Sequence, residues 1–263
     1  REPRQLGTLA STTFLFSFIL GDGDVVLLRH WLRHYERLGI WPSHTSVAIR
    51  RRRSTSEAAL NETLSALSAA RVPLRNVDLI RAPPSDSLKI DLINAKMDGL
   101  PAGSWFIYAD VDEHFDYPCG IGHFWKPASC MLATMQDQLA WDGNITEVRD
   151  APEIFEQYPL QCQIRGILLS HVTNYKVQMV NVGGHGHRPR RFRTTHIVND
   201  SGAGGCVLSG ISRHYMMTTQ AMHGNQQKAA LVPAAPAPPG GRKGRQQHAH
   251  TPTQNWANGS CAN

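Results

Sequence analysis

Three acidic residues follow a short apolar run in the segment WFIYADVDEHF, residues 105–115, at a spacing suited to binding a cation. Asp110 and Asp112 are two positions apart, so on an extended segment their carboxylates point to the same side. Two desolvated carboxylates repel each other unless a positive charge neutralises them. Mn²⁺ or Mg²⁺ suits such a pair, because both ions prefer oxygen ligands and are often shared with substrate phosphates. The alternative is a solvated strand end, because D-x-D is common by chance.

The elements that must position these acids alternate between strand and helix along the first part of the chain. Apolar runs bounded by turn residues predict strands, and amphipathic stretches between them predict helices. The strands are expected at 15–20, 45–50, 76–82 and 104–110, and the helices at 24–39, 54–70 and 85–99. This alternation is typical of an α/β fold with a mostly parallel central sheet and helices on both faces. Such sheets bind ligands at the carboxyl ends of their strands, where Asp110 and Asp112 fall.

Local patterns add detail and extend the prediction to the end of the chain. Ser54 begins an S-x-x-E pattern that predicts a capping box for the second helix. Residues 128–140 are expected to form a helix, and residues 175–181 alternate like a strand. Residues 229–263 are rich in Ala, Pro, Gly and Gln, which predicts a disordered tail.

The composition is that of a globular chain with an uneven positive charge. The 263 residues are 41% hydrophobic, which is enough to bury a core. The formal net charge is +6, and arginine clusters at 50–53 and 188–193 carry much of it. The charge suits an anionic partner such as a nucleotide or a membrane surface, although simple solubility is the commoner reason for such a charge. No stretch has the roughly 18 apolar residues that cross a bilayer, so membrane association is expected only through an upstream segment outside this sequence.

Cysteines and glycosylation sequons leave the compartment open. The five cysteines contain no CxxC pair, and they fit either two disulfides with one free thiol or five reduced thiols. They are Cys119, Cys130, Cys162, Cys206 and Cys261. Four N-x-S/T sequons matter only if the chain is secretory. They begin at Asn61, Asn144, Asn199 and Asn258.

Three segments together resemble a known family. They are RHWLRHYERLGI at 29–40, WFIYADVDEHF at 105–115 and ISRHY at 211–215. They are similar to the helix after the first strand, the acidic metal motif and the late histidine–aromatic pair of family 2-like and family 92-like glycosyltransferases with a GT-A fold. The resemblance runs roughly from residue 14 to residue 217.

The resemblance implies one GT-A-like domain at 10–228, with a nucleotide-sugar-binding half at 10–118 and an acceptor-side half at 119–228. The implied enzyme is a hexosyltransferase that moves a sugar from a nucleotide-sugar donor, a UDP-sugar above all, to a glycan or glycoconjugate hydroxyl. The implied location is the lumen of the Golgi or another secretory-pathway compartment, or the cytoplasm if the source is bacterial.

The resemblance also implies roles for single residues. Asp110 and Asp112 would hold Mn²⁺, or Mg²⁺, together with the donor diphosphate, and His214 would complete the metal site. Asp24 lies where the family has an acid near the nucleotide base, although an acid there also complements a helix dipole. Lys176 is placed to approach a phosphate, and its alternative is an ordinary surface lysine.

The catalytic base of inverting members is an acid of the second half of the domain. Glu147, Asp150 and Glu153 are the candidates, and the sequence does not rank them. Glu113 is either an acid on the acceptor side or a cap on the turn that follows the metal motif.

The chain departs from the family pattern after its second strand. The family has an Asp-containing segment there that helps to hold the nucleotide, whereas this chain reads IRRRRSTSE at 49–57. Arg50 to Arg53 would contact phosphate or form a solvated charge run. This departure keeps open a catalytically degenerate domain that binds sugar or nucleotide.

Other classes of protein are less well supported. His185, His187, His196 and His214 offer ligands for a Zn²⁺ hydrolase site, but no H-E-x-x-H is present. Nucleic-acid binding would rest on the arginine runs alone and is not favoured. The motifs GxGxxG after the first strand, GxxxxGK[ST] and GxSxG are absent, which argues against dinucleotide oxidoreductases, P-loop proteins and serine hydrolases.

Overall fold

The computed structural model describes 164 of the 263 residues of the chain. The described residues are 12–21, 25–82, 85–117, 121, 129–162, 175–183, 190–196, 198, 206–215 and 218. Asp24, His185, His187 and the predicted tail at 229–263 lie outside these residues, so what was predicted of them stays a prediction.

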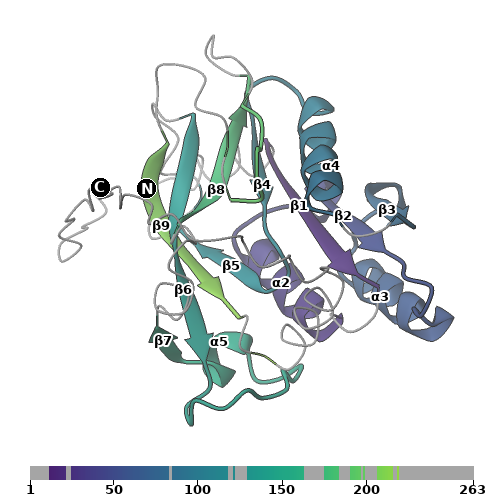
Figure 1. Ribbon diagram of the computed structural model, residues 1–263, viewed down its shortest axis with the longest axis vertical. Helices are drawn as coiled ribbons and strands as arrows, with labels where there is room; N and C mark the ends of the chain where they lie inside the picture. The colour runs from purple at the N-terminus through teal and green to yellow at the C-terminus, as the bar shows by residue number, and fades with distance from the viewer. Residues whose placement is uncertain are drawn as a thin grey trace, which may run out of the picture.

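Four parallel strands and three helices make up the first half of the described chain (Figure 1). The strands are β1 (Thr13–Leu20), β2 (Thr45–Arg50), β3 (Val77–Ile80) and β4 (Ser104–Tyr108). The helices are α2 (Val25–Arg37), α3 (Glu57–Ala69) and α4 (Asp86–Asp98), and the 3-10 turns are η1 (Pro42–His44) and η2 (Leu74–Asn76). The sequence prediction of these strands and helices is confirmed, with small differences at their ends.

The second half continues the same sheet with strands of both directions. Its elements are β5 (Glu113–Asp116), β6 (Cys130–Leu139), α5 (Ile154–Gln157), β7 (Leu160–Cys162), β8 (Tyr175–Val182) and β9 (Val207–His214). The strand order is β3-β2-β1-β4-β8-β6-β9-β5, and β7 pairs with β6. The strand β8 is antiparallel to both β4 and β6, whereas β9 is parallel to β6 and antiparallel to β5. The sheet is therefore mixed, and the expectation of a mostly parallel sheet holds only for β1 to β4.

Helices cover both faces of the parallel half, as the α/β pattern predicts. Successive residues of β4 point to opposite faces: Ile107 packs in the same core cluster as Trp31 of α2. Phe106 packs in a second cluster with Ile93 and Met97 of α4. Figure 1 shows α4 apart from α2 and α3, with the strands between them. Within the described residues, none of the helices has the length and apolar character needed to cross a bilayer.

The predicted helix at 128–140 is wrong, because residues 130–139 form the strand β6. Met, Leu, Ala and Gln favour a helix locally, but tertiary pairing overrides this preference. The strand β6 lies between β8 and β9 in the sheet, and buried and less buried residues alternate along most of its length. This alternation of burial has the period of a strand. The strands β8 and β9 pair with β6.

The predicted capping box at Ser54 is also wrong. The N-cap of α3 is Ser56, whose Oγ accepts a hydrogen bond from the Ala59 N–H. Thr55 is buried, and its Oγ1 accepts a hydrogen bond from the Arg52 N–H, so these residues form a turn before the helix. The helix therefore begins two residues later than a Ser54 cap requires.

Candidate active site at the carboxyl end of β4

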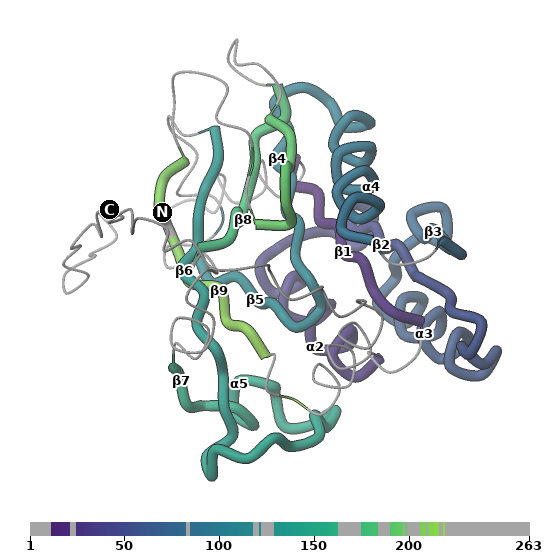
Figure 2. The backbone as a smooth tube through the Cα atoms, in the orientation of Figure 1, coloured from purple at the N-terminus to yellow at the C-terminus, as the bar shows by residue number. Residues whose placement is uncertain are grey.

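A tight turn joins β4 to β5 and carries the acidic motif (Figure 2). The Glu113 N–H donates to the Asp110 carbonyl oxygen at 2.9 Å. The Asp110 N–H donates in turn to Glu113 Oε2 at 3.0 Å. The Glu113 carboxylate therefore caps the turn that carries the motif. The sequence interpretation placed this cap on a turn after the motif, where β5 begins instead.

Asp110 is surrounded by donors and positive charge. Its Oδ1 accepts from Lys89 Nζ at 2.6 Å and from the Tyr108 hydroxyl at 2.5 Å. Its Oδ2 lies 3.2 Å from Lys176 Nζ. Burial raises the pKa of Asp110, but the two lysines outweigh burial and hold this pKa well below its usual value. Asp110 is therefore an anion held by two lysines, and metal binding by this carboxylate stays a prediction.

Lys176 is the central cation of this network. It comes from β8, and its side chain is 0% exposed. Its ammonium pairs with the Glu113 and Asp110 carboxylates and lies 4.9 Å from the centre of the Tyr108 ring. Burial lowers the pKa of Lys176, but the carboxylates outweigh burial and raise it, so the ammonium stays protonated. The surface-lysine alternative is wrong, and a contact between Lys176 and a phosphate stays a prediction.

Asp112 and His214 face each other at the end of the sheet. His214 Nε2 lies 3.6 Å from Asp112 Oδ2, and the Asp112 side chain is 20% exposed. On its other side, His214 Nδ1 lies 2.8 Å from Asp137 Oδ1. A carboxylate at one ring nitrogen orients an imidazole so that the other nitrogen can bind a metal. The structure thus brings together two of the three expected metal ligands, Asp112 and His214.

The backbone explains why these side chains meet. His214 in β9 is paired with Glu113 in β5 and with Asp137 in β6, so the three residues form one row across the sheet. The Tyr215 N–H also donates to the Asp112 carbonyl oxygen at 2.7 Å. The strand β9 therefore fixes His214 against the acidic turn.

The described part of the chain does not contain a complete metal site. No group of three or more His, Cys, Asp or Glu side chains there is arranged to hold an ion. His185 and His187 lie outside the described residues, so the zinc alternative stays a prediction. A metal at Asp112 and His214 would thus need further ligands, such as substrate phosphates or water.

The candidate catalytic acids lie on a segment attached to α2. Asp150 Oδ2 accepts from Arg29 at 2.7 Å, and Glu153 Oε2 accepts from Arg37 at 2.8 Å. Burial raises the pKa of Glu153, but Arg37 outweighs burial and lowers it below its usual value. Glu147 is exposed. The ion pairs attach Asp150 and Glu153 to the helix, and a catalytic role for any of the three acids stays a prediction.

The arginine run after β2 makes contacts with its own surroundings. Arg50 is buried, and its Nε donates to the Ala82 carbonyl oxygen at 3.2 Å. Arg51 forms an ion pair with Glu57 at the start of α3. Both contacts stabilise the loops at the carboxyl ends of β2 and β3, where an anion would approach the sheet.

Sequence reasoning missed three members of the site: Lys89, Tyr108 and Asp137. Lys89 lies in the first turn of α4, which follows β3 at the carboxyl edge of the sheet. This position is the one feature of the sequence that could have pointed to Lys89. Tyr108 is the last residue of β4. Its side chain is buried, and its hydroxyl donates a hydrogen bond to Asp110. Asp137 was hidden because its segment was predicted to be a helix.

No protein-family model matches this chain, and no curated protein sequence matches it. The fold and the site therefore define the class of protein: an α/β protein with a mixed sheet and a cluster of acids, lysines and one histidine beyond β4.

Proposed function

We propose that this chain is a metal-dependent glycosyltransferase with a GT-A-like fold. It moves a sugar from a nucleotide-sugar donor, above all a UDP-sugar, to a hydroxyl of a glycan or glycoconjugate. One observation carries the proposal: His214 Nε2 lies 3.6 Å from Asp112 Oδ2, beyond the carboxyl end of β4. The parallel order β3-β2-β1-β4 supports it, because open α/β sheets bind nucleotides at this end of their strands.

The residues present fit Mn²⁺ or Mg²⁺. The Asp112 carboxylate and the His214 imidazole would hold the ion, and Asp137 orients the imidazole through its Nδ1. When bound, the ion supplies positive charge that offsets the negative charge developing on the departing diphosphate.

The lysines of the site support an anionic substrate. The Lys89 ammonium is fixed by Asp110 at 2.6 Å, and its side chain is 17% exposed. A fixed cation at the edge of the sheet stabilises phosphate charge without reorganising. Lys176 holds Glu113 and Asp110, and so maintains the turn on which Asp112 lies.

The acceptor hydroxyl needs a base if the reaction inverts the configuration at the anomeric carbon of the sugar. The proposal assigns this role to one of Glu147, Asp150 and Glu153. Asp150 and Glu153 form ion pairs with arginines of α2. Either of these two acids would therefore have to act as the base from within an ion pair. Glu147 and Asp150 are exposed, and Glu153 is partly buried.

The proposed location is the secretory pathway, with the Golgi lumen as its expected compartment. The disulfide between Cys130 and Cys206 supports this part of the proposal. Disulfides persist in oxidising compartments and are rare in the cytosol.

Donor hydrolysis tests the proposed activity. The wild-type chain should release UDP from a UDP-sugar in the presence of Mn²⁺, and a chelator should stop this release. Asp112→Asn should reduce the rate to background, because it removes the charge that holds the ion. Asp78→Asn is the matched control, since Asp78 forms only a partly exposed ion pair with Lys96. An Asp112→Asn variant with wild-type activity would contradict the metal assignment.

A further inference from the structure

An exposed turn follows β6. Residues 141–145 are all exposed, and Trp141 has 75% of its surface in contact with solvent. Gly143 has a φ of 71°, a left-handed conformation that favours glycine. The Gly143 N–H donates to the Ala140 carbonyl oxygen at 2.9 Å and closes the turn. The turn therefore presents the next residue, Asn144, at the surface.

Asn144 starts a sequon of three residues, Asn144-Ile145-Thr146. The segment is not helical, and Thr146 forms a β-bridge with Thr218. The Asn144 Nδ2 donates to Asp142 Oδ2 at 2.8 Å. Because an amide nitrogen carries two hydrogens, a sugar can replace one while the other still donates to Asp142. The folded turn thus accommodates a modified Asn144.

The sequon at Asn61 is a useful contrast, because it lies in the middle of α3. Thr63 is 3% exposed, whereas Thr146 is partly exposed and its Oγ1 donates to the Tyr158 hydroxyl at 3.1 Å. Residues two apart on a helix do not face each other, so the Asn61 amide and the Thr63 hydroxyl cannot act together there. The folded geometry therefore favours Asn144 over Asn61 as a modification site.

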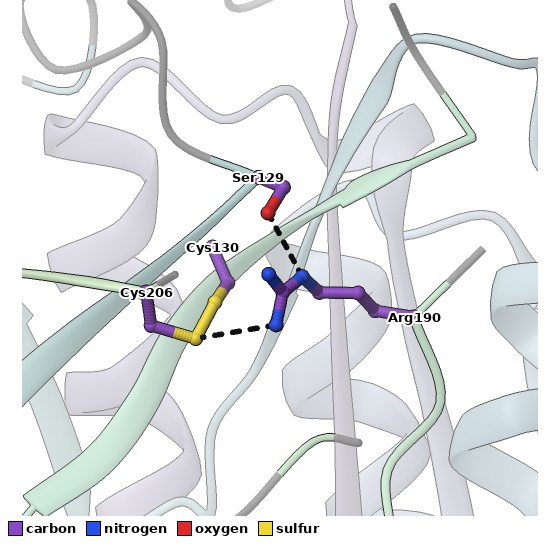
Figure 3. The surroundings of a disulfide bond; sticks show 4 residues. All are labelled: Ser129, Cys130, Arg190 and Cys206. Atoms are coloured by element: carbon purple, nitrogen blue, oxygen red, sulfur yellow. Dashed lines mark hydrogen bonds between the residues drawn. A yellow bond between two sulfur atoms is a disulfide. The ribbon is translucent and has the colours of Figure 1, made fainter. Parts of the chain in front are cut away.

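The disulfide supplies the independent indication of compartment (Figure 3). It joins Cys130, at the start of β6, to Cys206, at a sequence separation of 76. The buried Arg190 donates to Cys206 Sγ at 3.7 Å and to Ser129 Oγ at 2.9 Å. Cys130 is buried and Cys206 is partly buried, so the bridge belongs to the folded chain. Proteins with such bridges fold in oxidising compartments. Sequons are modified in the same compartments.

We propose that Asn144 carries an N-linked glycan, taken from a lipid-linked oligosaccharyl diphosphate during passage through the secretory pathway. The Asn144 Nδ2 loses a proton to the transferring enzyme and forms a bond to the anomeric carbon of the sugar. The bond between that carbon and the phosphate oxygen breaks, and its electron pair leaves with the lipid diphosphate. This inference does not rest on the proposed sugar transfer by the chain itself.

Mass spectrometry of the full 263-residue chain tests the site after secretion from a eukaryotic cell. Digestion with a peptide N-glycosidase should convert Asn144 to Asp in the wild-type chain. Asn144→Gln should lack one glycan on a denaturing gel, whereas Asn61→Gln should migrate like the wild-type chain. Thr146→Ser keeps the hydroxyl of the sequon and should keep the glycan, and Thr146→Val should lose it.

The result that overturns the proposal is an unmodified Asn144 in secreted chain whose Cys130–Cys206 bridge is intact. A glycan at Asn61 in place of Asn144 would also overturn it. Neither result bears on donor hydrolysis, so a failure of this inference is distinct from a failure of the proposed enzyme.

Discussion

At the scale of single residues, the main feature is a buried lysine that compensates two carboxylates. Lys176 is fully enclosed, and its ammonium is the shared partner of Glu113 and Asp110. A buried charge is costly alone and tolerable in a pair, so the loss of one partner should be more harmful than the loss of both.

Lys176→Met should lower the free energy of unfolding by about 3–5 kcal/mol, because it leaves the Glu113 carboxylate buried without a cation. Lys96→Met is the matched control. Lys96 forms a partly exposed ion pair with Asp78, so its loss should cost less than about 1 kcal/mol. Urea unfolding measures both values.

The double variant Lys176→Met with Glu113→Gln should recover part of the lost stability, because it removes a carboxylate that would otherwise remain uncompensated. If Lys176→Met has the same midpoint urea concentration of unfolding as the wild-type chain, the ion-pair network does not stabilise the fold.

The sequence identified only part of this network. Asp110 and Asp112 stand out because they are two positions apart directly after an apolar strand, where a sheet of this kind binds ligands. Lys176 and Asp110 are 66 positions apart, and His214 and Asp137 are 77 apart. Each residue of these pairs is ordinary in its local sequence, and only strand pairing brings them together. Asp137 had no local signal at all.

At the scale of elements, local pattern and tertiary pairing agree in the first half of the chain and at β8, where the strand predicted at 175–181 is confirmed, and they disagree at β6. The strands β1, β2 and β4 are apolar runs between clear helices, so their sequence suffices to predict them. The strand β6 contains helix-favouring residues and is held as a strand by β8 and β9. Pairing between distant segments is not visible in local propensity, which explains this error.

The strand β9 is packed so closely that Gly210 has no room for a side chain. A Cβ there would lie 2.5 Å from the Asp116 carbonyl oxygen and 2.8 Å from Gln178 Nε2. Gly210→Ala should therefore lower the free energy of unfolding by about 1–3 kcal/mol, because the backbone of β5 would have to move.

Gly99→Ala is the matched control for Gly210→Ala. A Cβ at Gly99 would meet the Lys96 carbonyl oxygen at 3.6 Å, and Gly99 has a φ of −79°. Alanine fits this conformation and should leave stability unchanged or raise it slightly. Thermal unfolding compares the two variants. Equal melting temperatures for both would show that β9 and β5 are less closely packed than the structure indicates.

At the scale of the whole molecule, one sheet connects the two halves and places the site at their junction. The acidic turn joins β4 to β5, Lys176 comes from β8, and His214 comes from β9. The candidate site therefore depends on strands from both halves. The parallel order of β1 to β4 supports nucleotide binding, and the remaining strands contribute the residues that hold the acidic turn.

The most direct test of the central proposal is the melting temperature of the full chain with Mn²⁺ and UDP. A ligand at 100 times its Kd stabilises the folded state by about 2.7 kcal/mol, which corresponds to a rise of several degrees. The wild-type chain and Asp78→Asn should show this rise with both ligands together, and Asp112→Asn should not. An equal rise of the melting temperature in Asp112→Asn would contradict a metal-dependent nucleotide-sugar site at Asp112 and His214. A melting temperature that rises with duplex DNA but does not rise with any nucleotide would also contradict it.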